Sequence, residues 1–429
     1  MKIQIPAPAQ EIIRKLNENG YEAYVVGGCV RDMLLGREPG DWDITTSALP
    51  QQVKQVFRRT LDTGIQHGTV TVMMDKIGYE VTTYRIDGEY SDGRHPDSVA
   101  FTPDLVEDLK RRDFTINAMA YNGATGFVDE FGGVEDLKNG IIRCVGEPME
   151  RFTEDALRIL RAIRFSAQLG FEIEKKTFEA IRVIAPNLTH VSKERIQMEL
   201  TKLLLSAHPE KMALVYETGI SPYVSETFHE IGNQPLPWVP VTVPALKHMR
   251  WAAFLRVCTP SGAAAILRDL KLDNDTINRV KTLVEWVGEP VAECSGKAAP
   301  EAEVPEGEIV QLQKYAIRRV MSSMEPQLFD DLLLLKKCLA SDGKCSDAVF
   351  ETPKQLEHIA ALTEEIRRDG DCISLKTLAV TGNDIITAGV KPGKAVGLVL
   401  SRLLEQVLER PERNTKEYLL EQVKKDITR

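Results

Sequence analysis

The sequence lacks the features that mark membrane, secreted and zinc-binding proteins. Its apolar runs are far shorter than the stretch of about twenty residues that crosses a bilayer. The opening residues, MKIQIPAPAQEII, lack the apolar core and the cleavage site of a signal peptide. The seven cysteines include no C-x-x-C pair, which argues against both a disulfide framework and a zinc site. We therefore expect reduced thiols, a cytoplasmic location and no membrane association.

Positive charge is also scarce. The chain has 54 Lys and Arg residues against 63 Asp and Glu residues, which gives a formal net charge of −9. That balance argues against a nucleic-acid partner but does not exclude one, because only the field along the bound strand matters. The basic residues that would supply such a field are Lys110, Arg111, Arg112, Arg151, Arg158, Arg161 and Arg164.

The length and the apolar pattern predict more than one domain. At 429 residues the chain is too long for one compact core, and length alone suggests about three domains. Strand-like and helical segments alternate up to about residue 145, and the periodicity is almost wholly helical from about residue 150 onward. Two stretches have the composition of linkers, residues 232–244 and residues 290–308. We therefore predict an α+β fold with its strands in the N-terminal third.

A pair of carboxylates stands at the centre of the N-terminal segment. Asp41 and Asp43 lie in a strand predicted over 41–45, where alternate side chains share a face. Two carboxylates on one face repel each other, and divalent cations would remove that repulsion. Gly27 and Gly28 come shortly before them, and glycines let backbone N–H groups approach an anion closely. The alternative for an isolated Asp-x-Asp is a solvated turn or a helix cap.

Further strands are predicted after the carboxylates. Residues 69–74 and 79–85 have the pattern of a hairpin. On the second strand Glu80 would share a face with Thr82, either as a third carboxylate facing metal ions or as an edge-strand side chain in water. Residues 86–98, DGEYSDGRHPDSV, have the composition of a mobile loop.

A basic segment follows the loop. Arg112, Asp113 and Asn117 combine guanidinium, carboxylate and amide groups, which suit a triphosphate and a ribose. The alternative is a capped helix start with a solvated basic turn.

One helix carries a pair of opposite charges. A helix is predicted over 153–169 with Thr153 as its N-cap, and Asp155 and Arg158 would lie on one face of it. A carboxylate acceptor beside a guanidinium donor complements the edge that cytosine and adenine share, an amino donor next to a ring-nitrogen acceptor, and mismatches uracil and guanine. The alternative is a surface ion pair, the usual meaning of this spacing. Another helix is predicted over 192–205.

Several long motifs occur in an order that resembles a known enzyme family. They are GGCVRD, GDWDITTSA, TGIQHGTVTV, YEVTTYR, RRDFTINAMA, FGGVEDLKNGIIR, EDALRILRAIRFSAQLGF and VSKERIQMELTKLL. Together they resemble the class II tRNA nucleotidyltransferases, above all the bacterial CCA-adding enzymes, of the DNA polymerase β-like nucleotidyltransferase superfamily. The resemblance implies a head with a mixed β-sheet followed by an extended all-α neck, body and tail. We accordingly predict a catalytic head over 1–145, a neck over 146–235, a body over 236–300 and a tRNA-binding tail over 301–429.

The resemblance also implies roles for individual residues. Asp41 and Asp43 match the catalytic, metal-binding carboxylates, which would hold Mg²⁺ ions that activate the primer 3′-hydroxyl and steady the departing pyrophosphate. Glu80 is the candidate for a third metal ligand. Asp155 and Arg158 match the pair that replaces a nucleic-acid template. The other predicted nucleotide-binding residues are Gly27, Gly28, Arg31, Arg112, Asp113, Asn117, Arg161 and Arg164.

The implied function is template-independent addition of C-C-A to the 3′ end of tRNA from CTP and ATP. Relatives that add only the two cytidines lack the flexible loop before the RRD motif, and this chain has it. The alternatives are an A-adding enzyme, a poly(A) polymerase or, from another class, a catalytically silent RNA-binding protein. The presence of both Asp41 and Asp43 disfavours the silent protein.

Two further expectations concern domains and partners. No His-Asp dipeptide occurs, so the phosphohydrolase domain of some relatives is not indicated, and no protein partner is predicted. The glycine-rich segment over 389–397 resembles a tRNA-binding tail, and its alternative is a helix-loop-helix packing device.

Overall fold

The chain of the computed structural model divides into two compact units. The first comprises residues 1–236 with 269–272, and the second comprises residues 237–268 with 273–429. The predicted head, neck, body and tail divide the chain more finely than these units, and their boundaries stay predictions. The structure describes residues 4–88, 98–292, 306–345 and 349–427.

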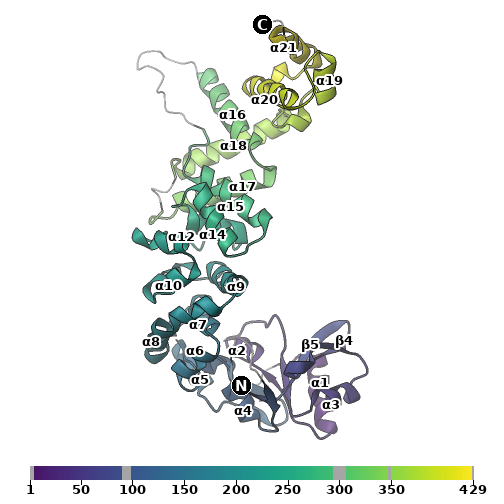
Figure 1. Ribbon diagram of the computed structural model, residues 1–429, viewed down its shortest axis with the longest axis vertical. Helices are drawn as coiled ribbons and strands as arrows, with labels where there is room; N and C mark the ends of the chain where they lie inside the picture. Colours follow the sequence, from purple (N-terminus) through teal and green to yellow (C-terminus); the bar gives the residue numbers. More distant parts are fainter. Residues whose placement is uncertain (1–3, 89–97, 293–305, 346–348, 428–429) are drawn as a thin grey trace. The chain divides into compact units, whose positions relative to one another are not determined.

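A seven-stranded sheet occupies the N-terminal part of the first unit (Figure 1). Its strand order is β3-β4-β5-β2-β1-β8-β9, and β2 pairs parallel with β5 but antiparallel with β1. The sheet is therefore mixed, and the predicted α+β class is confirmed. The strands are β1 (Ala23–Val26), β2 (Ile44–Thr46), β3 (Thr60–Gly64), β4 (Thr69–Met74), β5 (Ile77–Thr83), β8 (Ala120–Asn122) and β9 (Gly126–Val128).

Helices cover this sheet. Its strand β1 consists of Ala, Tyr and Val residues, and all of them are buried. The helices α1 (Ala7–Glu18) and α3 (Pro50–Val56) pack against β1, β2, β4 and β5. Tyr24 and Val26 of β1 instead pack with α4 (Leu105–Lys110) in a separate apolar cluster. The sheet is thus a rigid support for the loops that follow β1 and precede β2.

The predicted hairpin is confirmed, since β4 and β5 pair antiparallel. Asp75 and Lys76 at its turn have φ values of 50° and 68°. Two consecutive positive φ values belong to the type I′ turn, whose twist matches that of the flanking strands. Strand β3 pairs with the other side of β4. The sequence analysis does not predict β3, because its residues do not alternate between apolar and polar, and none of them is buried in the structure.

Two short sheets complete the β-structure. The strands β6 (Arg85–Asp87) and β7 (Val99–Phe101) pair antiparallel, and β10 (Ile141–Ile142) pairs parallel with β11 (Glu172–Ile173). Residues 89–97, most of the predicted loop over 86–98, lie outside the described residues.

The rest of the first unit is helical. The helices α7 and α9 pack together and are joined by a buried ion pair between Arg164 and Glu199. The helix predicted over 192–205 is confirmed as α9. The remaining helices of this unit are α2 (Gly28–Leu34), α5 (Gly133–Asn139), α6 (Pro148–Glu154), α7 (Leu157–Leu169), α8 (Lys175–Ile184), α9 (Lys193–Leu204), α10 (Ala213–Glu217), α11 (Ser221–Val224) and α12 (Glu226–Glu230).

The second unit is helical throughout its described residues, and it contains fully paired buried charges. Lys336 is fully buried and lies 2.8 Å from the carboxylate of Glu351. This pair anchors the segment before α18 to α17, because a buried charge without its partner is strongly destabilising. Residues 293–305 of the second predicted linker lie outside the described residues. The helices are α13 (Lys247–Leu255), α14 (Pro260–Asp269), α15 (Asn274–Val287), α16 (Glu306–Ser322), α17 (Pro326–Ala340), α18 (Pro353–Asp369), α19 (Gly382–Thr387), α20 (Lys394–Glu409) and α21 (Lys416–Ile427).

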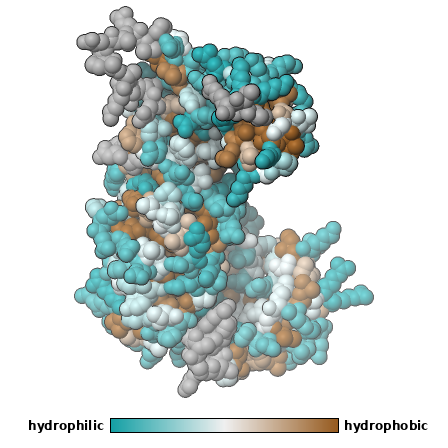
Figure 2. All heavy atoms as spheres, turned by 45° about the horizontal axis from the view of Figure 1, so that its top comes forward, coloured by the Kyte–Doolittle hydropathy of each residue, from teal (hydrophilic) through white to brown (hydrophobic). Residues whose placement is uncertain are grey.

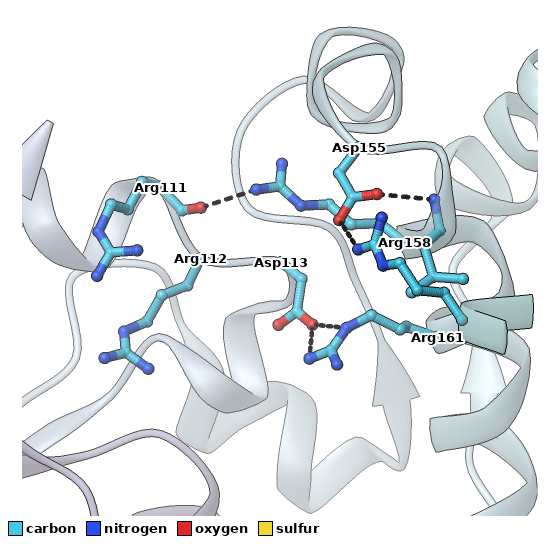
Figure 3. Close-up of a pocket in the computed structure, with 8 residues that line it drawn as sticks. Arg111, Arg112, Asp113, Asp155, Arg158 and Arg161 are labelled. Atoms are coloured by element: carbon cyan, nitrogen blue, oxygen red, sulfur yellow. Dashed lines mark hydrogen bonds and ion pairs between the residues drawn. The ribbon is translucent and has the colours of Figure 1, made fainter. Parts of the chain in front are cut away.

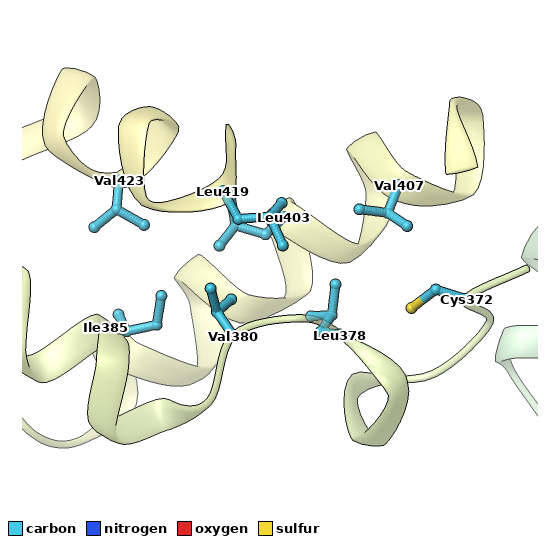
Figure 4. Close-up of a cluster of buried hydrophobic side chains, with 8 residues drawn as sticks. All are labelled: Cys372, Leu378, Val380, Ile385, Leu403, Val407, Leu419 and Val423. Carbon is cyan, nitrogen blue, oxygen red and sulfur yellow. The ribbon is translucent and has the colours of Figure 1, made fainter. Parts of the chain in front are cut away.

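The C-terminal helices share an apolar cluster of their own, the C-terminal cluster (Figure 4). Gly389 and Gly393, in the loop between α19 and α20, have φ values of 109° and 117°, which side-chain-bearing residues rarely adopt. The predicted helix-loop-helix arrangement is therefore present, and tRNA binding by it stays a prediction. The cluster consists of Cys372, Leu378, Val380, Ile385, Leu403, Val407, Leu419 and Val423.

The first half of α20 lies at the surface. Figure 2 shows a mainly hydrophilic face, with hydrophobic side chains gathered over the C-terminal helices. Leu398 is 73% exposed, and Lys391 and Lys394 are exposed near it in sequence. This end of the second unit thus offers both apolar and basic side chains to solvent.

Candidate active site

Three carboxylates act on one another beside the sheet. Asp41 and Glu80 are exposed, whereas Asp43 is half-buried. Burial and the charge of Asp41 raise the pKa of Asp43 to about 6, Arg112 opposes that rise, and Glu80 adds to it. The charges of Asp41 and Glu80 therefore both disfavour the ionised form of Asp43.

The backbone that carries the pair differs from the prediction. Strand β2 begins at Ile44, so the prediction of a strand from Asp41 is wrong. The carbonyl of Asp43 accepts a hydrogen bond from the Val26 N–H at 3.0 Å, which ties it to β1, and Asp41 lies in irregular structure. The two side chains are brought together by the loop that enters β2, because the chain reaches the sheet only at Asp43.

Gly27 and Arg112 pack against each other next to these carboxylates. Gly27 has a φ of +79°, and a Cβ atom on it would lie 2.8 Å from Nη1 of Arg112. Glycine is thus required here both by the backbone conformation and by the close approach of the guanidinium. The Nε of Arg112 is buried and has no hydrogen-bond partner among the described residues. An unpaired guanidinium donor beside a residue without a side chain suits an anion such as a phosphate.

A chain of hydrogen bonds joins α2 to α7. Arg31 on α2 donates to the Asn117 side chain at 2.7 Å, and Asn117 donates to Asp113 at 3.1 Å. Arg161 on α7 donates from Nε to the other oxygen of Asp113 at 2.8 Å. Burial alone would raise the pKa of Asp113, but the charge of Arg161 and the Asn117 hydrogen bond outweigh it and hold the pKa at about 2. Four predicted residues are therefore brought together, while Gly28 begins α2 one turn from Arg31.

The helix predicted over 153–169 is two helices, so that prediction is wrong. The helix α6 ends at Glu154 and α7 begins at Leu157. Between them Asp155 has an extended backbone, and its Oδ1 accepts the Leu157 N–H at 3.1 Å. An aspartate that binds a backbone N–H in this way favours a helix start over a helix interior. Thr153 is no N-cap, since its hydroxyl donates to a carbonyl within α6.

A pocket of about 260 Å³ lies between the segment 111–113 and the start of α7 (Figure 3). Arg158 donates to the carboxylate of Glu154 at 2.6 Å and to the Arg111 carbonyl at 3.3 Å. Asp155 accepts a hydrogen bond from Arg195 at 2.8 Å. Both members of the predicted selecting pair are therefore held in place by other groups. The lining residues are Arg111, Arg112, Asp113, Asp155, Leu157, Arg158, Arg161 and Arg195.

The positions of two arginines, Arg164 and Arg195, differ from the sequence-based expectation. Arg164, predicted to bind nucleotide, is not among the residues that line the pocket. It is buried, pairs with Glu199 and lies with its Cζ 3.8 Å from the centre of the Phe165 ring. Arg195 lines the pocket but is absent from the predicted site. The motif VSKERIQMELTKLL contains it, yet only the fold brings α9 to the start of α7.

Family models match three parts of the chain. The poly(A) polymerase head domain matches residues 23–143, which include the three carboxylates and Arg112. The model described as "Probable RNA and SrmB-binding site of polymerase A" matches residues 170–230. A model for tRNA nucleotidyltransferase domain 2 matches residues 344–423, which span the C-terminal cluster.

Individual relatives decide the assignment. A CCA-adding enzyme of Limosilactobacillus fermentum is 37% identical over 95% of this chain and 95% of its own length. The chain belongs to the CCA-adding enzyme family. A CCA-adding enzyme of Geobacillus thermodenitrificans is 45% identical over 66% of this chain and 71% of its own length. The crystal structure of the Bacillus stearothermophilus CCA-adding enzyme in complex with CTP is 31% identical, with a TM-score of 0.75, and covers 99% of this chain and 98% of that one.

Two other features are absent from the described residues. No helix there is long and apolar enough to span a bilayer. No group of three or more His, Cys, Asp or Glu side chains in that part of the chain is arranged to hold a metal ion. In this member of the CCA-adding enzymes, the metal-binding roles of Asp41, Asp43 and Glu80 accordingly stay predictions.

Proposed function

We propose that this CCA-adding enzyme extends the 3′ end of tRNA by C-C-A from CTP and ATP. In each step the primer 3′-oxygen bonds to the α-phosphorus of the nucleotide, the bond to the β-phosphate breaks, and pyrophosphate leaves. The observation that carries the proposal is the pocket in which Arg111, Arg112 and Asp113 face Asp155 and Arg158. Phosphate-binding and base-recognising side chains there share one space.

The carboxylates beside the pocket suit a hard divalent cation. They offer oxygen ligands only, and burial together with the neighbouring Asp41 raises the pKa of Asp43. A divalent cation would remove that repulsion, and oxygen is the ligand atom that Mg²⁺ prefers. Two Mg²⁺ ions held by Asp41 and Asp43, with Glu80 as the candidate third ligand, would supply positive charge to the attacking and leaving oxygens.

The triphosphate is bound, in this proposal, by the residues around Gly27. The buried, unpaired Nε of Arg112 is a donor without a protein acceptor among the described residues. Arg31 is fixed by Asn117, and Asn117 by Asp113, so the positive groups are positioned before the substrate arrives. Such preorganisation stabilises developing negative charge without a reorganisation cost during the reaction.

The base is selected by Asp155 and Arg158. Asp155 accepts from the exocyclic amino group of cytosine or adenine, since each carboxylate oxygen can accept more than one hydrogen bond. Arg158 donates to the adjacent ring nitrogen, and Glu154 holds its guanidinium at 2.6 Å. Uracil and guanine present a carbonyl and a ring N–H in these places, so both pairs of groups would be mismatched.

The experiment is stepwise addition to tRNA that lacks all three terminal residues. With CTP and Mg²⁺ we expect two cytidines, and a single adenosine follows when ATP is added. Addition of adenosine only to tRNA that already ends in C-C would favour the A-adding alternative. A long adenosine tail would favour a poly(A) polymerase, and no incorporation into any RNA would favour a silent RNA-binding protein.

A further inference from the structure

The side chain of Asp155 is held from two directions. Its Oδ1 accepts the N–H of Leu157 at 3.1 Å, and its Oδ2 accepts Nη2 of Arg195 at 2.8 Å. The two donors come from different elements, the start of α7 and the first turn of α9. Asp155 and Arg195 are both largely shielded from solvent, with side chains 14% and 17% exposed. The plane of the carboxylate is therefore fixed.

The fixed carboxylate has a definite hydrogen-bonding character. An ionised carboxylate only accepts hydrogen bonds, whereas a protonated one also donates. The guanidinium of Arg195 donates to one oxygen of Asp155 and the Leu157 N–H donates to the other, so both oxygens are held in place as acceptors. An acceptor of fixed orientation favours a base with an amino group and opposes a base with a carbonyl at the same place. A carboxylate that turned freely would lose this discrimination between the two kinds of base.

We propose that Arg195 is a positioning residue for nucleotide selection: it holds the carboxylate of Asp155 in one orientation as a hydrogen-bond acceptor, and so disfavours uracil and guanine. The inference rests on the proposed function, because it requires Asp155 to face the base. Arg195 lines the same pocket as Asp155 and Arg158. It acts through Asp155 and makes no contact with the reacting atoms.

A purely structural tie between α7 and α9 is the competing explanation of the Arg195 ion pair. The two helices already share the buried pair of Arg164 and Glu199, and they pack together. The second ion pair, between Arg195 and Asp155, is therefore not needed to hold α9 in place. The position of Arg195 is explained better by what it does to Asp155.

The test compares Arg195→Met with a matched control, Lys211→Met. Lys211 is 15% exposed and, like Arg195, joins separate elements of the same unit. It donates to the Ser166 hydroxyl and the Phe171 carbonyl at 2.9 Å, and it lies outside the residues that line the pocket. The readout is the ratio of kcat/KM for CTP to that for UTP, measured on tRNA that lacks the C-C-A end.

We expect Arg195→Met to lower the CTP-to-UTP ratio by about tenfold or more, because one charge-assisted hydrogen bond no longer orients the acceptor. Arg195→Lys should recover part of the ratio, and Lys211→Met should leave it unchanged although its thermal stability falls. An unchanged ratio in Arg195→Met, or an equal fall in that ratio in Lys211→Met, would overturn the proposal. If Arg195→Met does not fold, Arg195→Lys decides, and a ratio equal to that of the wild type overturns the proposal.

A double-mutant cycle separates this inference from the proposed function. Asp155→Asn should itself lower the CTP-to-UTP ratio, and Arg195→Met added to it should lower the ratio no further, since its target is gone. A further fall in the double variant would overturn the role through Asp155. A wild type that adds no cytidine, or an Asp155→Asn variant with full selectivity, would instead contradict the proposed function itself.

Discussion

The pocket of the first unit is lined mainly by charged side chains, whereas the C-terminal cluster of the second unit consists of apolar side chains. Seven of the eight residues that line the pocket are charged, and Asp113, Asp155, Arg158 and Arg161 each have a charged partner. The C-terminal cluster consists of eight apolar side chains that bury one another. A charged site loses its geometry when one partner is removed, whereas an apolar cluster loses stability in proportion to the surface exposed.

This difference separates two tasks. Side-chain charges held by hydrogen bonds can discriminate between base edges and can stabilise a phosphate, which an apolar cluster cannot. The apolar cluster supports helices whose outer surface is open, as the exposed first half of α20 illustrates. We therefore expect substitutions in the first unit to change catalysis and selection, and those on α20 to change affinity for RNA.

The largest expected effect is at the carboxylates. Asp43→Ala should lower the rate of nucleotide addition by at least about a thousandfold, because it removes one metal ligand and its transition-state stabilisation. Affinity for tRNA should stay nearly intact. Single-turnover addition from CTP in the presence of Mg²⁺ measures the rate, and filter binding measures the affinity for tRNA. Asp62→Ala is the control, since that carboxylate is about half exposed and pairs only with Lys54 among the described residues. Near-normal turnover of Asp43→Ala would contradict the metal assignment.

A smaller effect is expected at Arg158, for which we propose a role in base selection. Arg158→Lys should lower kcat/KM for CTP and ATP by about a hundredfold, because an ammonium cannot donate in the fixed planar geometry of a guanidinium. Steady-state kinetics with both nucleotides measure the effect. Arg182→Lys is the control, since Arg182 lies over the ring of Phe178 on α8, away from the pocket. Equal kinetics in the two variants would remove Arg158 from base recognition.

The ion pair of Asp113 makes stability depend on pH. Its pKa is held at about 2 against the ordinary 3.8, which corresponds to about 2 kcal/mol of stabilisation. The folded-state pKa is depressed, so this stabilisation is fully present above the ordinary pKa and is lost as the pH falls from about 4 to about 2. Thermal unfolding of wild type and Asp113→Asn should therefore differ most at pH 7 and converge below pH 4. A difference that stays constant over this range would contradict the assignment of the stabilisation to this carboxylate.

The smallest effect is expected at the two exposed lysines around the start of α20. Replacement of Lys391 and Lys394 by alanine should weaken tRNA binding several-fold. The affinity should also fall less steeply with salt, by the slope that corresponds to about two phosphate contacts. The KM for CTP should not change. Lys138→Ala, an exposed lysine of the first unit, serves as the control. An unchanged salt slope in the double variant would place the RNA contacts elsewhere.

The sequence motifs single out Arg112, Asp113, Asp155 and Arg158 together, and the structure brings these four residues to one pocket, while their roles stay predictions. The backbone that carries them is predicted less well. Periodicity misses the break between α6 and α7, because the helical pattern of the sequence runs on while Asp155 interrupts the helix by accepting one local hydrogen bond from Leu157.

The partners of the site residues require the fold. Arg195 is forty positions from Asp155, and Asn117 is 86 positions from Arg31, so neither contact is visible in a local pattern. The same holds for Arg164: its predicted place with Arg158 and Arg161 follows from the sequence, whereas its burial against Glu199 follows from the packing of α9 on α7.

The most direct test of protein-directed selection is the sequence of the products formed when all four nucleotides compete. Wild-type protein is incubated with tRNA that lacks its last three residues, Mg²⁺ and equal concentrations of the four triphosphates, and the 3′ ends are sequenced. The account predicts C-C-A ends and no extension beyond the adenosine. Ends that contain uridine or guanosine at comparable frequency, or runs of adenosine, would contradict it.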